Sequence, residues 1–451
     1  MTTRETVATK LESLRTRSRD FTRRSRSLRR RLAVFLAVVG PGIITSNVDN
    51  DAGGISVYTG AGAQFGYKLL WSLIPMTIAL YVSEEMCARM GVVTGKGLSD
   101  LIREEFGFRS TFFVMIAALF VDLFNTVAEF SGIAEASQVM HVSKYISVPL
   151  AAIAVWLLVV YGTYHAVEKI FLVACGFYLS YIVSAILAKP DWLYAAHETV
   201  IPSAQMNSAY LLMLIGLVGT TIAPWQFFYL QAGFVEKRVG VRQYKHAKWD
   251  VLVGSISCML IVFFIIVCCA ATLNRHPETQ NISSAAQAAQ ALAPLAGRFA
   301  GWLFAFGLLN ASLFAASILP LSTAHVICEG LGFEAGLDNK FKEAPTFYSL
   351  YTLLIVAGAG IVLWPKAPLW KILIYSQVGN GIWLPIVLIF ILLLVNRKDL
   401  MGDHTNTFGF NLVAWGMSII MIVLTLILMY TAIAEPPSSG LATWLLHLRF
   451  L

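Results

Sequence analysis

Charged residues are scarce in this sequence: Asp, Glu, Lys and Arg make up 13% of the 451 residues, and 57% are hydrophobic. Water-soluble domains carry about twice that share of charge, so a solvated globular protein is excluded. The mean hydropathy of +0.69 indicates an integral membrane protein. The six cysteines show no CxxC spacing, which favours buried thiols over disulfides or zinc ligands. Neither an HExxH motif nor a nucleophile with its base stands out, so we predict no enzymatic activity.

Apolar stretches long enough to cross a bilayer recur along the whole chain. A transmembrane helix needs about 20 mostly apolar residues. Eleven candidate spans are centred near residues 50, 80, 125, 155, 178, 220, 260, 312, 355, 382 and 422. Strands of a membrane barrel would be shorter and would alternate apolar with polar residues. The sequence therefore predicts an all-α polytopic protein with one membrane domain.

The first 31 residues differ from the rest, with eleven Lys or Arg against three acidic residues. We expect this basic tail, residues 1–31, to be largely disordered or to lie on the membrane surface, and we expect no signal cleavage. Lys and Arg also gather after the second, sixth and tenth spans, as they do in cytoplasmic loops. These patterns predict a cytoplasmic N-terminus and an external C-terminus in the plasma membrane. The net charge of +7 follows from this topology and does not indicate a nucleic-acid partner.

Two of the spans are interrupted at their midpoints. The first contains GPGIITSNVDNDAGG and the sixth contains LIGLVGTTIAPWQ, five spans later. Broken helices at corresponding positions of two halves indicate a secondary transporter with inverted repeats, whose substrate binds near the middle of the membrane. The predicted parts are a first five-helix repeat at residues 32–188, a second at 207–396, an eleventh helix at 408–434 and a short external tail at 435–451.

Asp51 lies in the first break, although a charged side chain at a helix centre costs about 2.5 to 3.5 kcal/mol in a bilayer. The C-terminal ends of half-helices carry partial negative charge, and Asp51 adds a full charge beside them. We therefore hypothesise that the partner of Asp51 is the transported cation. Two alternatives stay open: neighbouring helices could satisfy the freed backbone groups, and Asp49 or Asp51 could pair with a basic residue elsewhere.

Four segments resemble, in order and spacing, the signatures of the NRAMP family of divalent-metal transporters. They are GPGIITSNVDNDAGGISVYTGAGAQFGY at 40–67, VTGKGLSDLIREEFG at 93–107, VAEFSGIAEA at 127–136 and AQALAPLAG at 289–297. The resemblance implies a leucine-transporter-like fold with alternating access, in which helices 1 and 6 are unwound at mid-membrane. It also implies a divalent cation as transported substrate, no cofactor, a surrounding lipid bilayer, and a monomer with no obligate protein partner.

The sequence departs from the family at both breaks. Its Asp-Pro-Gly-Asn motif keeps the aspartate as Asp51 but has Gly54 in place of asparagine. Its Ala-x-x-Met-Pro-His pattern begins here at Thr220, with Ala223 replacing methionine and Trp225 replacing histidine. Methionine sulfur suits transition metals, whereas Mg²⁺ prefers oxygen and gives up its water reluctantly. The substitutions resemble those of the NRAMP-related magnesium transporters and imply a widened site for largely hydrated Mg²⁺, with Mn²⁺ as second substrate.

The resemblance also bears on proton coupling. In proton-coupled members the missing histidine and carboxylates of the third helix are associated with proton movement. Here Thr126 stands where the family has aspartate, and only Glu129 is retained. We predict cation entry without proton coupling, because a relay needs titratable groups. The alternative is a proton-coupled Mn²⁺ or Fe²⁺ importer of the main NRAMP type. An organic-solute carrier of the same fold is disfavoured by Asp51.

Other polar residues complete the predicted site. Gln377 matches a position that the family places near the ion, although an interhelical hydrogen bond explains it equally well. Glu84 and Glu85, near Arg89, are explained by an ordinary (i, i+4) pair from Glu85. The candidate metal-site residues are Asp51, Gly54, Thr220, Ala223 and Gln377. The candidates for an ion or proton pathway are Asp49, Asn50, Asp122, Glu129, Asn380 and Trp225, with Asn50 expected to cap the second half-helix.

Overall fold

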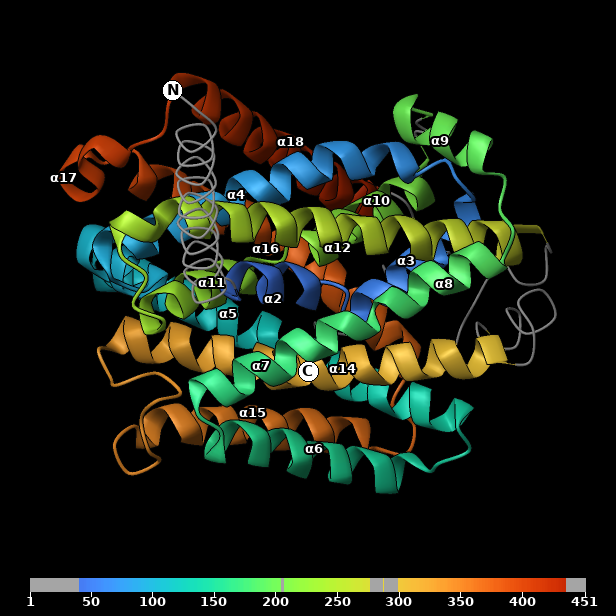
Figure 1. Cartoon of the computed structure of the whole chain (residues 1–451), viewed down its shortest axis with the longest axis horizontal. Coiled ribbons are helices and arrows are strands. Elements are labelled where there is room, and N and C mark those ends of the chain that lie inside the picture. Colours follow the sequence, from blue (N-terminus) through green and yellow to red (C-terminus); the bar gives the residue numbers. More distant parts are fainter. Residues whose placement is uncertain (1–39, 204–206, 276–286, 288–298, 435–451) are drawn as a thin grey trace, which may run out of the picture.

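The computed structural model describes residues 40–203, 207–275, 287 and 299–434. Within these ranges every regular element is a helix (Figure 1). The predicted basic tail at 1–31 and the predicted external tail at 435–451 lie outside the described residues.

The helices follow the order expected from the apolar spans. The first five spans are α2 (Pro41–Val48) with α3 (Ala52–Phe65), α4 (Leu73–Thr94), α5 (Leu98–Val139), α6 (Lys144–Tyr161), and α7 (Tyr164–Phe177) with α8 (Leu179–Leu187). The next five are α10 (Ser208–Thr221) with α11 (Pro224–Glu236), α12 (Tyr244–Thr272), α14 (Phe299–Leu331), α15 (Pro345–Val362) and α16 (Leu369–Val395). The last long helix is α18 (Phe408–Ala434), and the short α9 (Trp192–Val200) and α17 (Lys398–Met401) lie in connections.

Nine of the described helical segments are long and apolar enough to cross a membrane. The two further spans that the sequence predicted are the first and the second. The first falls short because the chain unwinds between α2 and α3, so neither piece has the required length. The second, α4, has the length but carries Glu84, Glu85 and Arg89 close together. Both exceptions place polar groups inside the bundle, where a membrane protein keeps its functional groups.

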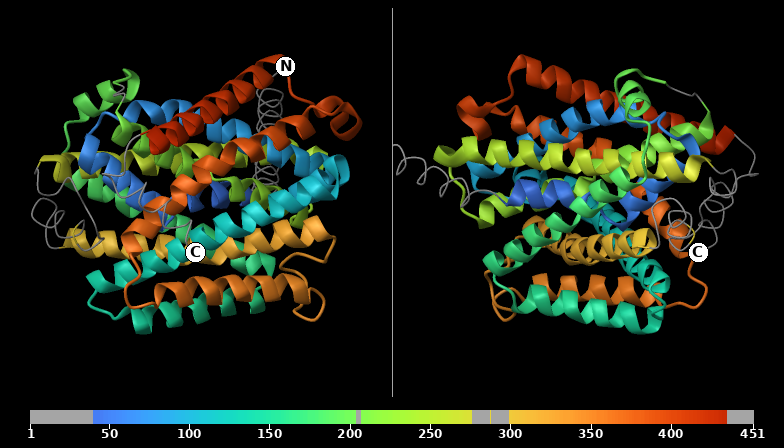
Figure 2. Two further views of the ribbon diagram at one scale, coloured as in Figure 1. Left: turned by 180° about the vertical axis from the view of Figure 1, so that it is seen from behind. Right: turned by 45° about the vertical axis from the view of Figure 1, so that its right-hand side comes forward.

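The helices form two packed groups that meet along α5 and α14. One group contains α5, α6, α14 and α15, with α6 against α15 at the lower edge of Figure 1. In the other, α12 packs on α2 and α3, while α4 packs on α11. The first span thus contacts the seventh, and the sixth contacts the second. Each contact pairs the first helix of one repeat with the second helix of the other, as expected from two related repeats. The rear and oblique views in Figure 2 show the same arrangement.

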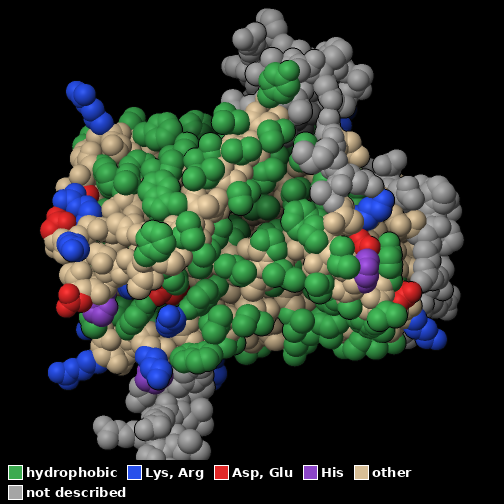
Figure 3. Space-filling model, turned by 90° about the horizontal axis from the view of Figure 1, so that it is seen from above, with side chains coloured by type: hydrophobic (Ala, Val, Ile, Leu, Met, Phe, Trp, Pro, Cys, Tyr) green, Lys and Arg blue, Asp and Glu red, His purple; other side chains and the backbone are tan. Residues whose placement is uncertain are grey.

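The outer surface of the bundle is apolar over its middle. Figure 3 shows hydrophobic side chains across the centre of one face, with charged side chains gathered at its two ends. On α6 and α15 the outward-facing Leu150, Ile153 and Leu353 are 65%, 57% and 60% exposed. An apolar band of this kind is what a helical bundle presents to lipid. The chain is a multi-pass membrane protein.

Candidate cation site at the two helix breaks

The first span unwinds between α2 and α3, and Asp51 begins the second half-helix. Its backbone is extended, at φ −72° and ψ −178°, and its Oδ1 accepts the Gly54 N–H at 2.5 Å. Asp51 is therefore the cap of α3, since its side chain satisfies an N–H that has no partner inside the helix. The expectation that Asn50 caps this helix is wrong, because the Asn50 amide donates to Cys258 Sγ at 3.6 Å.

The sixth span unwinds at Ile222 and Ala223, between α10 and α11. Their backbones leave the helical region, with ψ of 67° and 136° respectively. Pro224 then starts α11, a position that suits proline because the first helical N–H has no partner inside the helix. The sequence correctly predicted both interruptions.

Side chains tie the two breaks together. The Tyr58 hydroxyl donates to the Asp49 carbonyl at 3.2 Å and lies 3.4 Å from Thr221 Oγ1. The Gln226 amide, with its nitrogen toward Asp49, donates to both carboxylate oxygens at 2.5 and 2.9 Å. In that orientation its carbonyl accepts the Ala223 N–H at 3.1 Å. Asp49 is thus a link between the breaks, and Ala223 is joined to it through one amide.

Oxygen atoms gather beside Gly54, at the start of α3. A Cβ atom at this position would lie 2.6 Å from the Asp49 carbonyl, 2.8 Å from Thr220 Oγ1 and 3.1 Å from Asp51 Oδ1. The Thr220 hydroxyl is buried and has no hydrogen-bond partner among the residues that the structure describes. Asp51 Oδ2 also lies 3.4 Å from Gln377 Nε2. Four of the five predicted metal-site residues therefore meet at one place.

The space beside Gly54 is narrow in this conformation. The sequence predicted a widened cavity there, but the Asp49 carbonyl approaches so closely that even a methyl group would force a shift. The unwound backbone therefore lies where a side chain at this position would begin. The widened site expected from Gly54 and Ala223 together stays a prediction.

A second carboxylate lies next to Asp51. Glu129 on α5 accepts the Ala52 N–H at 3.2 Å through Oε2, and its carboxyl group lies within hydrogen-bonding distance of that of Asp51. Its Oε1 receives no hydrogen from any donor in the described part of the chain. Asp51 is 2% exposed and Glu129 is fully buried. Among the described residues, no Lys, Arg or His pairs with either group. Buried negative charge without a basic partner requires a cation or a proton nearby.

Another buried carboxylate, Glu84 on α4, was explained wrongly from the sequence. The Glu85–Arg89 pair forms as expected, at 3.1 Å. Glu84 instead points into the bundle, where Ser46 Oγ donates to it at 2.7 and 2.9 Å and Ser255 Oγ at 3.0 Å. The signal in the sequence was an acidic residue, Glu84, within an apolar run. It was missed because the Glu85–Arg89 pair next to it offers an explanation for both acidic residues.

Asp250 on α12 was missed entirely. It is fully buried and accepts three backbone N–H groups at the start of α2, with the shortest bond, 2.7 Å, to Gly42. Its place directly after Lys245 and Lys248 made it resemble a cytoplasmic loop residue. The carboxylate holds the N-terminal end of α2 in place, since the free N–H groups at a helix N-terminus bind anions.

The remaining pathway candidates are all buried, but they do not converge. Asp122 and Asn380 belong to a hydrogen-bonded chain that reaches Asp51 through Gln377. Trp225 is 1% exposed, and its carbonyl accepts Ser322 Oγ at 2.9 Å on the side of α14. Neither Trp225 nor Ala223 is hydrogen-bonded to Asp51 in the described structure.

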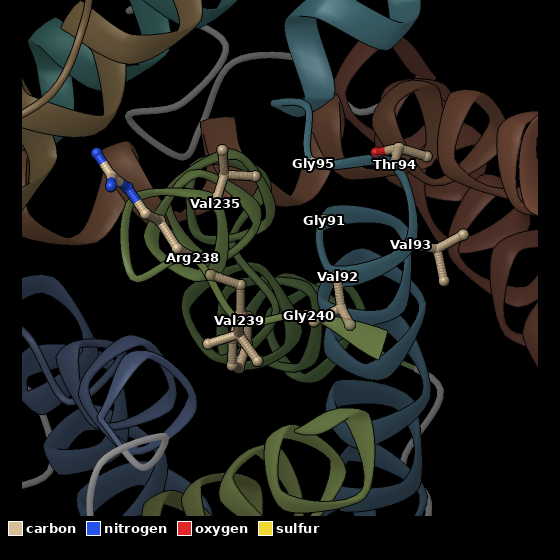
Figure 4. Close-up of a pocket in the computed structure, with 10 residues that line it drawn as sticks. Gly91, Val92, Val93, Thr94, Gly95, Val235, Arg238, Val239 and Gly240 are labelled. Carbon is tan, nitrogen blue, oxygen red and sulfur yellow. The ribbon is translucent and has the colours of Figure 1, made fainter. Parts of the chain in front are cut away.

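A cavity of about 400 Å³ lies between the ends of α4 and α11 (Figure 4). Its lining includes the C-terminal residues of α4, Gly91 to Gly95, and Arg238 after α11. None of the candidate site residues lines this cavity. It is therefore distinct from the oxygen cluster at the breaks.

The comparisons with known proteins agree with this architecture. The Nramp family model, described as natural resistance-associated macrophage protein-like, matches residues 42–431. The chain belongs to this family. It is thus a transporter rather than an enzyme, and the metal ion of such a transporter is its cargo and not a cofactor.

Individual relatives are similar over almost the whole chain. The divalent metal cation transporter MntH of Deinococcus radiodurans is 28% identical over 410 residues, which is 88% of this chain and 89% of that protein. MntH of Burkholderia ambifaria is 25% identical over 413 residues, covering 89% and 90%. A crystal structure of the Eremococcus coleocola manganese transporter superposes with a TM-score of 0.74 at 22% identity, covering 90% and 89%. This likeness confirms the predicted leucine-transporter-like fold.

Proposed function

We propose that this protein mediates the uptake of divalent cations, chiefly Mg²⁺ with Mn²⁺ as second substrate, by alternating access and without proton coupling. Family membership and the MntH relatives, which are divalent metal cation transporters, support the class of cargo. The choice of Mg²⁺ rests on the chemistry of the groups beside Asp51.

The observation that carries the proposal is the cluster of oxygen atoms beside Gly54, several of which can accept further hydrogen bonds. Among the described residues Thr220 Oγ1 has no hydrogen-bond partner, and the carboxyl groups of Asp51 and Glu129 lie within hydrogen-bonding distance of each other, with Gln377 Nε2 3.4 Å from Asp51 Oδ2. Mg²⁺ binds oxygen and usually keeps several waters, whose hydrogens require acceptors of this kind. Ala223 offers no sulfur to favour a softer ion.

The absence of proton coupling is supported by the third helix. The Thr126 hydroxyl donates to the Asp122 carbonyl at 2.7 Å within its own helix, so this position holds a satisfied neutral group. The family's histidine position holds Trp225, which cannot titrate. Entry of a divalent cation then relies on the membrane potential, worth about 4.6 kcal/mol for two charges at 100 mV.

We place the protein in the plasma membrane as a monomer, with the N-terminal side of α2 in the cytoplasm and the end of α18 outside. The loops rich in Lys and Arg support this orientation. The two inverted repeats are proposed to be residues 32–188 and 207–396.

A second candidate function is proton-coupled uptake of Mn²⁺ or Fe²⁺. The observation that favours it is the retained Glu129, since a buried carboxyl group beside that of Asp51 can also hold a proton. The similar fold of a manganese transporter agrees with this candidate as well as with the first.

Potential-driven uptake into proteoliposomes tests the proposal. Purified protein is reconstituted, an inside-negative potential is set with K⁺ and valinomycin, and an internal dye reports Mg²⁺. We expect uptake that grows with the potential and disappears in Asp51→Ala. Entry of Mn²⁺ but not Mg²⁺ would contradict the assignment of the chief substrate.

A further inference from the structure

A chain of buried polar side chains leads from Asp51 into the helices behind the candidate site. Gln377 Nε2 donates to Asp51 Oδ2 at 3.4 Å, and Asn380 Nδ2 donates to Gln377 Oε1 at 2.9 Å. Asn380 and Asn125 exchange two hydrogen bonds, of 3.2 and 2.8 Å. Asn125 Nδ2 also donates to Asp122 Oδ1 at 3.5 Å. We call Gln377, Asn380 and Asn125 the amide ladder.

The two ends of the amide ladder determine how its amides point. The ladder has Asp51 at one end and Asp122 at the other, and it donates a hydrogen bond to each of them. Gln377 therefore turns its NH₂ group toward Asp51, and Asn125 turns its NH₂ group toward Asp122. The ladder is fully buried, so a hydrogen bond lost within it is costly.

This orientation conflicts with cation binding at Asp51. A cation, bare or hydrated, needs acceptor oxygens, because the waters bound to it point their hydrogens outward. In the present arrangement Gln377 offers an NH₂ group, which is a donor. Gln377 must therefore rotate its amide before its oxygen can contact the cation or its water shell.

Rotation of Gln377 cannot occur alone. Its NH₂ group would then face the NH₂ group of Asn380, so Asn380 must rotate as well. Because Asn380 and Asn125 exchange two hydrogen bonds, Asn125 has to follow. Its oxygen would then face Asp122 Oδ1, and an ionised carboxylate has no hydrogen to donate. The reversed ladder thus ends in two acceptors that face each other.

We propose that Asp122 is a positioning residue that holds the amide ladder in the orientation opposing cation binding, and that cation entry reverses the ladder. The proposal rests on the proposed function, because it takes Gln377 as a contact of the transported cation. Its consequence is unusual for a cation transporter, since a buried negative charge lowers the affinity for the cation.

The substitution Asp122→Asn tests this role. Asparagine can donate as well as accept, so the reversed ladder would have a partner at its end. We expect the KM for Mg²⁺ to fall about three- to tenfold, the effect of one hydrogen bond between neutral groups. If Asp122 acted only as an attracting charge, the same substitution would raise KM. A raised or unchanged KM overturns the proposal.

Two further variants keep the test decisive if Asp122→Asn folds poorly. Asn125→Leu retains Asp122 but interrupts the ladder, so the KM for Mg²⁺ should also fall. The variant that combines Asp122→Asn with Asn125→Leu should have a KM no lower than that of either single variant. Thr323→Val is the matched control: its hydroxyl donates to Asp122 Oδ2 at 2.8 Å, outside the ladder, and KM should stay within about twofold.

The same experiment separates this proposal from the proposed function. If the wild type carries no Mg²⁺, the proposed function fails, and the variants are compared with Mn²⁺, which needs the same acceptor from Gln377. If the wild type carries Mg²⁺ and neither Asp122→Asn nor Asn125→Leu lowers KM, the ladder proposal fails while the proposed function stands.

Discussion

Replacing Asp51 by asparagine separates its two roles in the structure. Oδ1 caps α3 through the Gly54 N–H, and an asparagine oxygen can accept the same bond. Oδ2 lies 3.4 Å from Gln377 Nε2, beside the Glu129 carboxyl group, and is the oxygen that we assign to the cation. Asp51→Asn therefore keeps the cap and removes the charge, whereas Asp51→Ala removes both.

The expected loss of affinity follows from the contacts of that oxygen. A hydrogen bond to a charged group contributes about 1 to 1.5 kcal/mol more than one to a neutral group. If Oδ2 receives two waters of the cation, Asp51→Asn loses about 2 to 3 kcal/mol, or roughly 30- to 150-fold in affinity. Asp51→Ala should lose about 1 kcal/mol of folding stability in addition, from the missing cap.

The assay combines Mg²⁺ uptake with thermal unfolding of the purified protein. Asp51→Asn should unfold no earlier than the wild type, since it removes a buried charge beside Glu129. Asp51→Ala should unfold earlier than Asp51→Asn. If the KM of Asp51→Asn for Mg²⁺ stays within threefold of the wild-type value, the assignment of Asp51 Oδ2 to the cation is wrong.

Two further predictions concern the other positions at the breaks. Gly54→Ala should lower the unfolding temperature and the uptake rate, because its methyl group would press on the Asp49 carbonyl at a cost of about 1 to 3 kcal/mol; the control, Gly379→Ala, meets no atom within 4 Å and should change neither. Ala223→Met should shift the ratio of Mg²⁺ to Mn²⁺ uptake toward Mn²⁺ by about tenfold if sulfur selects the ion, whereas Ala223→Leu supplies the bulk alone and should not. An equal shift with leucine would make space, and not sulfur, the selector.

The local features of the site could be predicted from the sequence. Gly, Pro and polar residues inside apolar spans marked both breaks, and the structure unwinds the chain at Asp51 and at Ala223. The resemblance of the motifs singled out Thr220 and Gln377, which lie beside Gly54 and Asp51. These predictions succeeded because a break is encoded within a few neighbouring residues.

The partners of buried polar groups could not be predicted in the same way. Glu84 bonds with Ser255, and Asn125 with Asn380, across 171 and 255 residues of sequence. A single sequence gives the period of a helix but not which helix faces a given side chain. The close approach of the Asp49 carbonyl to Gly54 could not be predicted for a related reason, since it depends on the path of the unwound backbone.

The most direct test of the account follows Mg²⁺ and internal pH together in one proteoliposome preparation. We expect Mg²⁺ entry driven by the membrane potential, with no acidification of the lumen. Mn²⁺ entry with acidification, and no Mg²⁺ signal, would contradict it and would return the protein to the proton-coupled manganese importers.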